Sequence, residues 1–214
     1  MARVKSVIIC IFLILILAGC QTTPEEKIYH ILEQTVAKEK EFDEQQKPLM
    51  DLEASEKELF DKIIDLGMKE MDKVTELSNS ALKNLEQRRE KMMIEQDSIL
   101  SSKKEFSKIE DTIKEIKTEK IKIEAEQLYQ LMEKRYDTHD RLYKAYIRGI
   151  DENVKLYQLL KKDELPIEDL ENQIDVTNKA YSEVLKMNKL FNECTKEFND
   201  SKLKFYKDAN IKID

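Results

Sequence analysis

Apolar residues recur every seven positions along almost the whole chain, and this repeat limits the fold more than any other feature. A seven-residue repeat keeps one face of a long helix apolar over many turns, and it is typical of helices that pack at shallow angles. No segment of comparable length alternates apolar and polar residues as a strand does. The longest series are Met92, Ile99, Phe106 and Ile113; Tyr129, Tyr136, Tyr143, Ile150 and Tyr157; and Leu170, Thr177, Val184, Phe191, Phe198 and Phe205.

Few residues interrupt this pattern. The 214 residues include three glycines and three prolines, and 38% are charged. That composition is typical of long solvated helices. We therefore expect an all-α fold, an elongated antiparallel helical bundle or coiled-coil-like rod, that forms one domain over residues 24–214. A core this narrow predicts no internal chamber.

Capping and proline signals divide this domain into four expected helices. Thr23, Pro24 and Glu26 form a capping box with proline at the first helical position. Pro48 is expected to end or kink the first helix, because the residue before a proline avoids the helical region. Pro166 marks a turn, and a further reversal is needed near Thr118 or near residues 101–105, of which Thr118 gives the more symmetric hairpin. The expected helices are about 24–47, 49–117, 119–162 and 167–208.

Residues 1–19 have the organisation of a secretory signal peptide, with a basic start, an apolar run over 7–17 and a small-residue end. The run is too short to span a bilayer, which needs about 20 apolar residues. Leu17-Ala18-Gly19-Cys20 resembles the lipobox of bacterial lipoproteins. The resemblance implies cleavage between Gly19 and Cys20, a diacylglycerol on Cys20, and a tether over residues 20–23. An uncleaved anchor and an ordinary secretory signal are the alternatives.

The charge of the chain argues against binding to nucleic acid or to anionic lipid headgroups, and its cysteines argue against an internal disulfide. The whole chain has a formal charge of −7, and the leader would remove two basic residues and no acidic one. An acidic body is a poor partner for nucleic acid and for anionic headgroups. Cys10 would leave with the leader and Cys20 would carry lipid, so Cys194 remains without a disulfide partner in the monomer. Cys194 lies in a helical pattern and is expected to be a small packing residue, with a redox role for its free thiol as the alternative.

The sequence offers little for catalysis. Its two histidines, His30 and His139, fall in different expected helices, and there is no glycine-rich phosphate loop or cysteine pair at metal spacing. We expect that the protein is not an enzyme, and that it has no catalytic residue, no metal and no cofactor other than the covalent diacylglycerol. His139 is expected on the helix surface or in a helix seam, with a pH-sensitive or metal-binding role as the alternative.

Two groups of residues are candidates for wall binding. Tyr129, Tyr136 and Tyr143 either stack on sugar rings or lie in a helix seam with only their hydroxyls at the edge. Lys114, Lys117 and Lys120 surround the expected turn and either form a basic tip that touches anionic wall polymers or lie solvated among acidic neighbours. For the tyrosines, the heptad spacing favours a place in a helix seam. For the lysines, the nearby acidic residues favour a solvated turn without a binding role.

Several short motifs follow one another along the chain. They are Glu39-x-Glu41-Phe42, Leu52-Glu53-x-x-Glu56-x-x-Leu59, Leu131-Met132-Glu133-Lys134-Arg135-Tyr136, Leu142-Tyr143-Lys144-Ala145-Tyr146 and Asn178-Lys179-Ala180-Tyr181. Taken in this order, the motifs resemble the YkyA family of Gram-positive lipoproteins, for which cell-wall binding has been suggested. The resemblance covers residues 20–206 and implies a lipoprotein on the extracytoplasmic face of the cell membrane, with no catalytic residue to transfer.

These features predict a non-enzymatic, lipid-anchored cell-surface protein that binds peptidoglycan or another wall polymer, or organises the envelope as a helical scaffold. One alternative is a surface adaptor that binds another envelope protein. Another is a membrane-active, toxin-like protein, although the mature chain has no apolar stretch long enough to span a bilayer. A homodimer stays open, because heptad seams can also be satisfied between chains.

Overall fold

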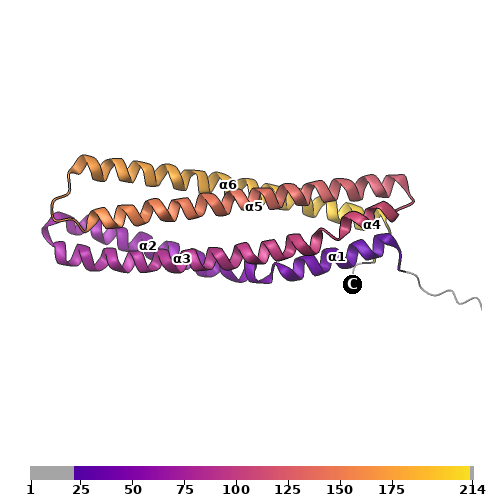
Figure 1. Cartoon of the computed structure of the whole chain (residues 1–214), viewed down its shortest axis with the longest axis horizontal. Helices are drawn as coiled ribbons and strands as arrows, with labels where there is room; N and C mark the ends of the chain where they lie inside the picture. The colour runs from indigo at the N-terminus through magenta and orange to yellow at the C-terminus, as the bar shows by residue number, and fades with distance from the viewer. Residues whose placement is uncertain (1–21, 213–214) are drawn as a thin grey trace, which may run out of the picture.

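The computed structural model describes residues 22–212, and helices cover nearly all of this range. No strand occurs among these residues, so the predicted all-α fold is confirmed. Figure 1 shows the helices running side by side as an elongated bundle. The elements are α1 (Pro24–Lys38), α2 (Lys40–Leu66), η1 (Gly67–Lys69), α3 (Met71–Phe106), α4 (Ile109–Glu115), α5 (Glu119–Leu160) and α6 (Ile167–Asp208).

Two antiparallel hairpins make up the rod. Helices α5 and α6 form the longer hairpin, and α2 and α3 form the second, with α3 packed against α5. Helix α5 has 42 residues and so extends for about 63 Å at 1.5 Å per residue. The start of α1, helix α4 and the end of α6 lie at one end of the rod, and the α2–α3 and α5–α6 turns lie at the other (Figure 1).

The apolar interior forms two clusters, one in each half of the rod. The first surrounds Phe106, Leu128 and Phe205 near the start of α1. The second surrounds Leu85 and Tyr157 toward the far turns. Phe42 packs against both clusters. The apolar residues of the heptad repeat therefore form a cluster in each half of the rod. Between the two clusters the interior also contains polar side chains, such as His139 and Glu95.

The expected helix end at Pro48 is wrong. Helix α2 continues through Pro48, and the break lies at Glu39, where φ is −88° and ψ is 6°. A proline inside a helix removes one N–H and frees the carbonyl four residues earlier. That carbonyl belongs to Glu44, which is exposed, so water can satisfy it. Packing of α2 along α3, with Leu49 buried, keeps the helix intact.

The expected single helix over 49–117 is also wrong, because the chain reverses at Gly67–Glu70 and starts α3 at Met71. Gly67 has φ 58° and ψ −164°, a conformation that side chains with a Cβ avoid. A single glycine inside a helical pattern is a weak signal for a turn. The heptad repeat on both sides of Gly67 therefore predicts one continuous helix, although the chain reverses there. The later reversals lie near their expected places, since α5 begins at Glu119 and α6 at Ile167.

We expect Gly67→Ala to lower the free energy of unfolding by about 1–3 kcal/mol through backbone strain. A Cβ at this position would meet no atom within 4 Å, so a steric clash does not contribute. Urea unfolding followed by helix circular dichroism measures the effect. Gly149→Ala is a poor control because its Cβ would lie 3.2 Å from the Tyr181 ring, so Ser55→Ala on exposed α2 surface serves instead. Equal stability of the two variants would show that Gly67 does not set the turn.

Candidate functional site

The lipobox residues Leu17, Ala18, Gly19 and Cys20 lie outside the described residues. The structure starts just beyond them with the expected capping box. The Glu26 N–H donates to Thr23 Oγ1 at 3.2 Å, and the Thr23 N–H donates to a Glu26 carboxylate oxygen at 2.9 Å. The rigid body thus begins three residues after Cys20. Among residues 22–212, no helix is long and apolar enough to cross a membrane.

The three candidate lysines lie at the same end of the rod as the start of α1. Lys114 pairs with Asp111 at 2.8 Å, and Lys120 pairs with Asp208 at 2.7 Å. Lys117 is exposed between them. Acidic partners therefore offset most of the basic character. A protein anchored through Cys20 would also hold this end beside the membrane, so the structure does not favour a basic tip that reaches outward to the wall.

The tyrosine series lies mainly in the helix seam. Tyr136 is 3% exposed, and its hydroxyl lies 2.8 Å from Ser102 Oγ. Tyr129 stacks on Phe106 with ring centroids 5.6 Å apart. Tyr143 is half-buried. The sugar-stacking interpretation is therefore wrong for Tyr136, whose ring faces are covered by the bundle, and the seam interpretation holds there.

Burial raises the pKa of six tyrosine hydroxyls above the ordinary value of 10.0. One is that of Tyr129, and the other five belong to tyrosines that the bundle largely covers, which predicts alkaline unfolding. Below pH about 10 the phenols are protonated in both the folded and unfolded states, so stability is full. Above it the unfolded chain ionises first, and the free energy of unfolding falls as pH rises. We expect phenolate absorbance and loss of helix to appear together. Gradual ionisation with the helix intact would contradict this. The five largely covered tyrosines are Tyr136, Tyr146, Tyr157, Tyr181 and Tyr206.

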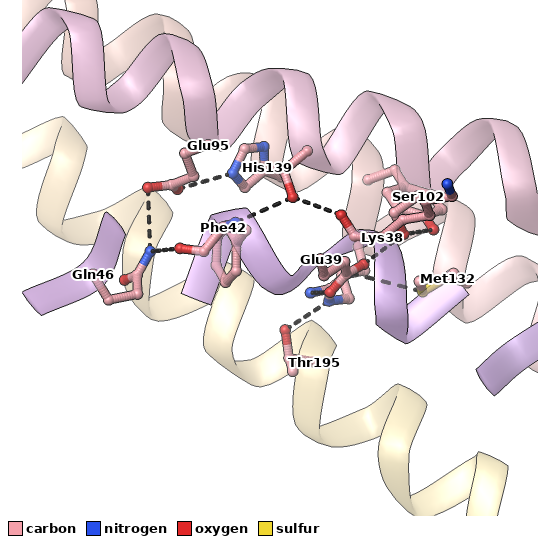
Figure 2. A network of polar contacts seen from close by, with 12 residues as sticks. Lys38, Glu39, Phe42, Gln46, Glu95, Ser102, Met132, His139 and Thr195 are labelled. Carbon is pink, nitrogen blue, oxygen red and sulfur yellow. Dashed lines mark hydrogen bonds and ion pairs between the residues drawn. The ribbon is translucent and has the colours of Figure 1, made fainter. Parts of the chain in front are cut away.

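His139 lies in the seam, as expected, and it is fully buried. Its Nε2 lies 3.1 Å from Glu95 Oε1 (Figure 2). The centroids of the Phe42 and Phe191 rings lie 5.6 and 5.2 Å from the centroid of the His139 ring. The Gln46 side chain donates to the other Glu95 oxygen at 3.2 Å. The described residues contain no group of three or more His, Cys, Asp or Glu side chains placed to hold a metal.

The rod has an open slot in its surface, which is not the internal chamber whose absence the narrow core predicts. A cavity of about 520 Å³ opens midway along the rod between α2 and α6, and we call it the α2–α6 slot. Helix α2 contributes residues from Phe42 to Glu56 and α6 contributes residues from Tyr181 to Thr195, while α3 and α5 form the floor. The slot exists because α2 packs on α3 and α6 packs on α5, so α2 and α6 make few direct contacts with each other.

Arg88 of α3 forms part of the floor and is 2% exposed. Its Nε and Nη2 donate to the Tyr146 hydroxyl at 3.0 and 2.9 Å, and Nη2 also reaches Glu53 at 3.3 Å. Burial alone would lower the pKa of the guanidinium, but the neighbouring Tyr181 and Tyr146 outweigh it and raise the pKa. Arg88 is therefore a permanent positive charge beneath the slot. Tyr157 donates to Glu56 beside it.

A second buried arginine, Arg135 of α5, holds the break between α1 and α2. Its Nη1 and Nη2 donate to the two Glu39 carboxylate oxygens at 2.8 and 2.7 Å, and its Nε donates to Thr195 at 3.0 Å. Ser102 also donates to Glu39 at 2.7 Å (Figure 2). The guanidinium lies over the Phe191 ring at 4.8 Å. These contacts join α3, α5 and α6 to the point where the N-terminal helix bends.

Ser98 of α3 satisfies the backbone at the same break. Its hydroxyl donates to the Lys38 carbonyl at 2.7 Å and accepts from the Phe42 N–H at 3.1 Å. A hydroxyl can do both because it carries one donor and two acceptor sites. Side chains of other helices, Ser98 of α3 and Arg135 of α5, therefore stabilise the break at Glu39.

Sequence reasoning missed Arg88, Glu95 and Arg135 because charged residues in a polar chain were assigned to solvated faces. A signal was present. Ala81, Arg88, Glu95 and Ser102 follow one another at intervals of seven, and all four are buried. Charged residues at heptad positions that otherwise hold apolar side chains indicate a polar interior, because burying a charge is costly unless it is paired.

The comparisons with known proteins agree with this fold and with the sequence motifs. Residues 23–208 match a family described as "Putative cell-wall binding lipoprotein", YkyA. The chain belongs to the YkyA family. An uncharacterized lipoprotein, YkyA of Bacillus subtilis (strain 168), is 37% identical over 200 residues, which are 93% of this chain and 90% of that protein. The predicted family resemblance is thus confirmed.

One solved structure shares the fold. A 1.6 Å crystal structure of a conserved protein of unknown function from Staphylococcus aureus superposes with a TM-score of 0.71 at 15% identity. The match covers 86% of this chain and 96% of that one. At this identity the likeness shows the architecture of this YkyA family member and nothing of its ligand.

Proposed function

We propose that this protein is a non-enzymatic, lipid-anchored binding protein on the outer face of the cell membrane, and that it binds the cell wall directly. Family membership supports a lipoprotein, and the lipobox motif supports attachment through Cys20. The capping box at Thr23 starts the rigid body beside the anchor. The rod would then extend its α2–α6 slot away from the membrane and toward the wall.

The observation that carries binding is the α2–α6 slot with its buried charged floor. Arg88, Glu95 and Arg135 are each less than 5% exposed. Replacing buried ion pairs by apolar residues is often neutral or stabilising, so a rod that served only as a spacer would gain little from them. Polar and charged groups at the base of a concave opening are instead typical of binding sites.

Co-sedimentation tests this proposal. Residues 21–214, which contain every helix of the bundle, are mixed with purified Gram-positive sacculi across a salt series, with and without removal of teichoic acid. We expect saturable pelleting that persists after teichoic acid is removed and changes little with salt, because the lysines near α4 are paired and lie at the anchored end. Pelleting no greater than that of an unrelated helical protein would exclude direct wall binding and leave the adaptor alternative.

A further inference from the structure

We infer that the α2–α6 slot is a sugar-binding site that takes a short stretch of an uncharged, N-acetylated glycan chain. The inference rests on the proposed wall binding and identifies the surface and the ligand class. It begins from the contrast between the two buried arginines. In Arg135 all three guanidinium nitrogens donate to Glu39 or Thr195. In Arg88 only Nε and Nη2 have acceptors within hydrogen-bond distance among the described residues.

The remaining nitrogen of Arg88 is left to the slot. Arg88 Nη1 lies 3.9 Å from Glu56 Oε2, beyond hydrogen-bond distance, and the Tyr181 ring lies on the guanidinium with its centroid 5.6 Å from Cζ. Arg88 is 2% exposed as a residue and lines the open slot. Water can reach this nitrogen through the slot, and a ligand oxygen would take the place of that water. All three nitrogens of Arg135 already have protein acceptors, so Arg135 offers the slot no such donor.

Carboxylates stand beside this free donor. Glu53 and Glu56 line the slot on α2, and Arg88 pairs with both. A group that accepts from Arg88 Nη1 and donates to Glu53 or Glu56 fits this arrangement. Hydroxyl groups do both, and so do secondary amides, through their carbonyl and N–H. A chain of N-acetylated sugars offers both kinds of group at short intervals.

The charge of the slot excludes an anionic ligand. Three carboxylates line it, from Glu53, Glu56 and Glu95, against Arg88 and Arg135. The carboxylate of Glu39 already holds Arg135 bidentately, at 2.7 and 2.8 Å. The local balance is therefore acidic, and phosphate polymers would be repelled at close range. A neutral glycan meets no such penalty.

The rim and the dimensions fit a sugar chain. Met50 of α2 and Leu185 of α6 line the slot and are 68% and 71% exposed, so both present apolar surface at the opening. C–H faces of sugar rings and acetamido methyl groups can pack on such side chains. Asn188 and Asn192 add amide groups from α6. The α2 wall from Phe42 to Glu56 is about 21 Å long at 1.5 Å per residue, and about 520 Å³ lies within the usual range for ligand sites.

Titration calorimetry with the N-acetylglucosamine tetramer tests the inference on residues 21–214. We expect saturable binding to the unchanged protein, weakened about tenfold or more by Glu53→Gln, because a hydrogen bond to a charged acceptor becomes one to a neutral acceptor. Glu58→Gln, an exposed position on the same helix, is the matched control and should bind as the unchanged protein does. Equal weakening by both variants would overturn the inference.

A second pair of variants avoids any dependence on folding. Leu185→Ala removes an exposed side chain from the rim, while Leu203→Ala removes a 56% exposed leucine from α6 away from the slot. Only Leu185→Ala should weaken tetramer binding. Pelleting with sacculi but no tetramer binding would overturn the sugar assignment and leave wall binding standing. Slot-dependent binding of purified teichoic acid in place of the tetramer would also overturn it. Absence of pelleting would instead contradict the proposed function itself.

Discussion

Replacing Arg135 by methionine is expected to lower the free energy of unfolding by about 3–5 kcal/mol, because it leaves the Glu39 carboxylate charged and mostly buried without its partner. The two side chains are 5% and 15% exposed, and their two hydrogen bonds are 2.8 and 2.7 Å long. Methionine keeps the apolar stem of the residue and removes only the charge and the donors. Urea unfolding followed by helix circular dichroism measures the loss.

Two further variants separate the ion pair from other effects. Arg141→Met removes an exposed arginine from the same helix and should change the free energy of unfolding by about 0.5 kcal/mol or less. The double variant Glu39→Gln with Arg135→Met leaves no unpaired charge at the break, so it should recover part of the stability that Arg135→Met loses. If Arg135→Met unfolds at the same urea concentration as Arg141→Met, the Glu39 pair does not stabilise the α1–α2 break.

Loss of the lipid is the other large expected effect. Cys20→Ser should abolish incorporation of radioactive palmitate by growing cells and should leave an uncleaved, larger precursor, because the thiolate that accepts the lipid is missing. Two acyl chains give stable anchoring, so the unchanged protein should stay with the membrane fraction after high-salt washing. Gel electrophoresis with autoradiography reports both the label and the size.

The other two cysteines supply matched controls for the anchor. Cys10→Ser changes the leader itself, and Cys194→Ser changes a residue of α6 that is 1% exposed. Both variants should keep the palmitate label and the mature size. Label that persists in the Cys20→Ser variant, or cleavage that proceeds without Cys20, would exclude the lipobox interpretation and favour an ordinary secretory signal.

Periodicity predicted the long hairpin well because its cause is local. A seam repeated every seven residues, as in Leu170, Thr177 and Val184, keeps one helix face apolar whatever the neighbouring helix is. Pro166 supports the turn before α6 for the same reason, because a proline restricts its own backbone and that of the preceding residue. The class of fold, the family and the turn at Pro166 therefore follow from the chain alone, whereas the structure decided between the two possible starts of the hairpin in favour of Glu119.

The bends in the N-terminal half depend on partners that are far away in sequence. Pro48 is a strong local signal, yet α2 passes through it because α3 packs along its length. The segment around Glu39 contains neither proline nor glycine, yet the chain bends there. Ser98 satisfies the freed backbone groups at this break, and Arg135 neutralises the Glu39 carboxylate. These contacts span 56 to 96 positions of sequence, so no local pattern contains them.

The sequence by itself determined an all-helical lipoprotein of the YkyA family with a capped start at Thr23, since these follow from periodicity, motifs and local capping. Only the tertiary structure decided which charged residues are interior and where the rod opens. The residues next to Arg88 in the sequence do not distinguish it from the other polar residues of the chain, and only the packing of α2, α5 and α6 around it buries its charge. The slot beside it exists because α2 and α6 pack on different partners. The free-energy cost of a charged side chain depends on the neighbours that remove it from water, and these neighbours come from distant parts of the sequence.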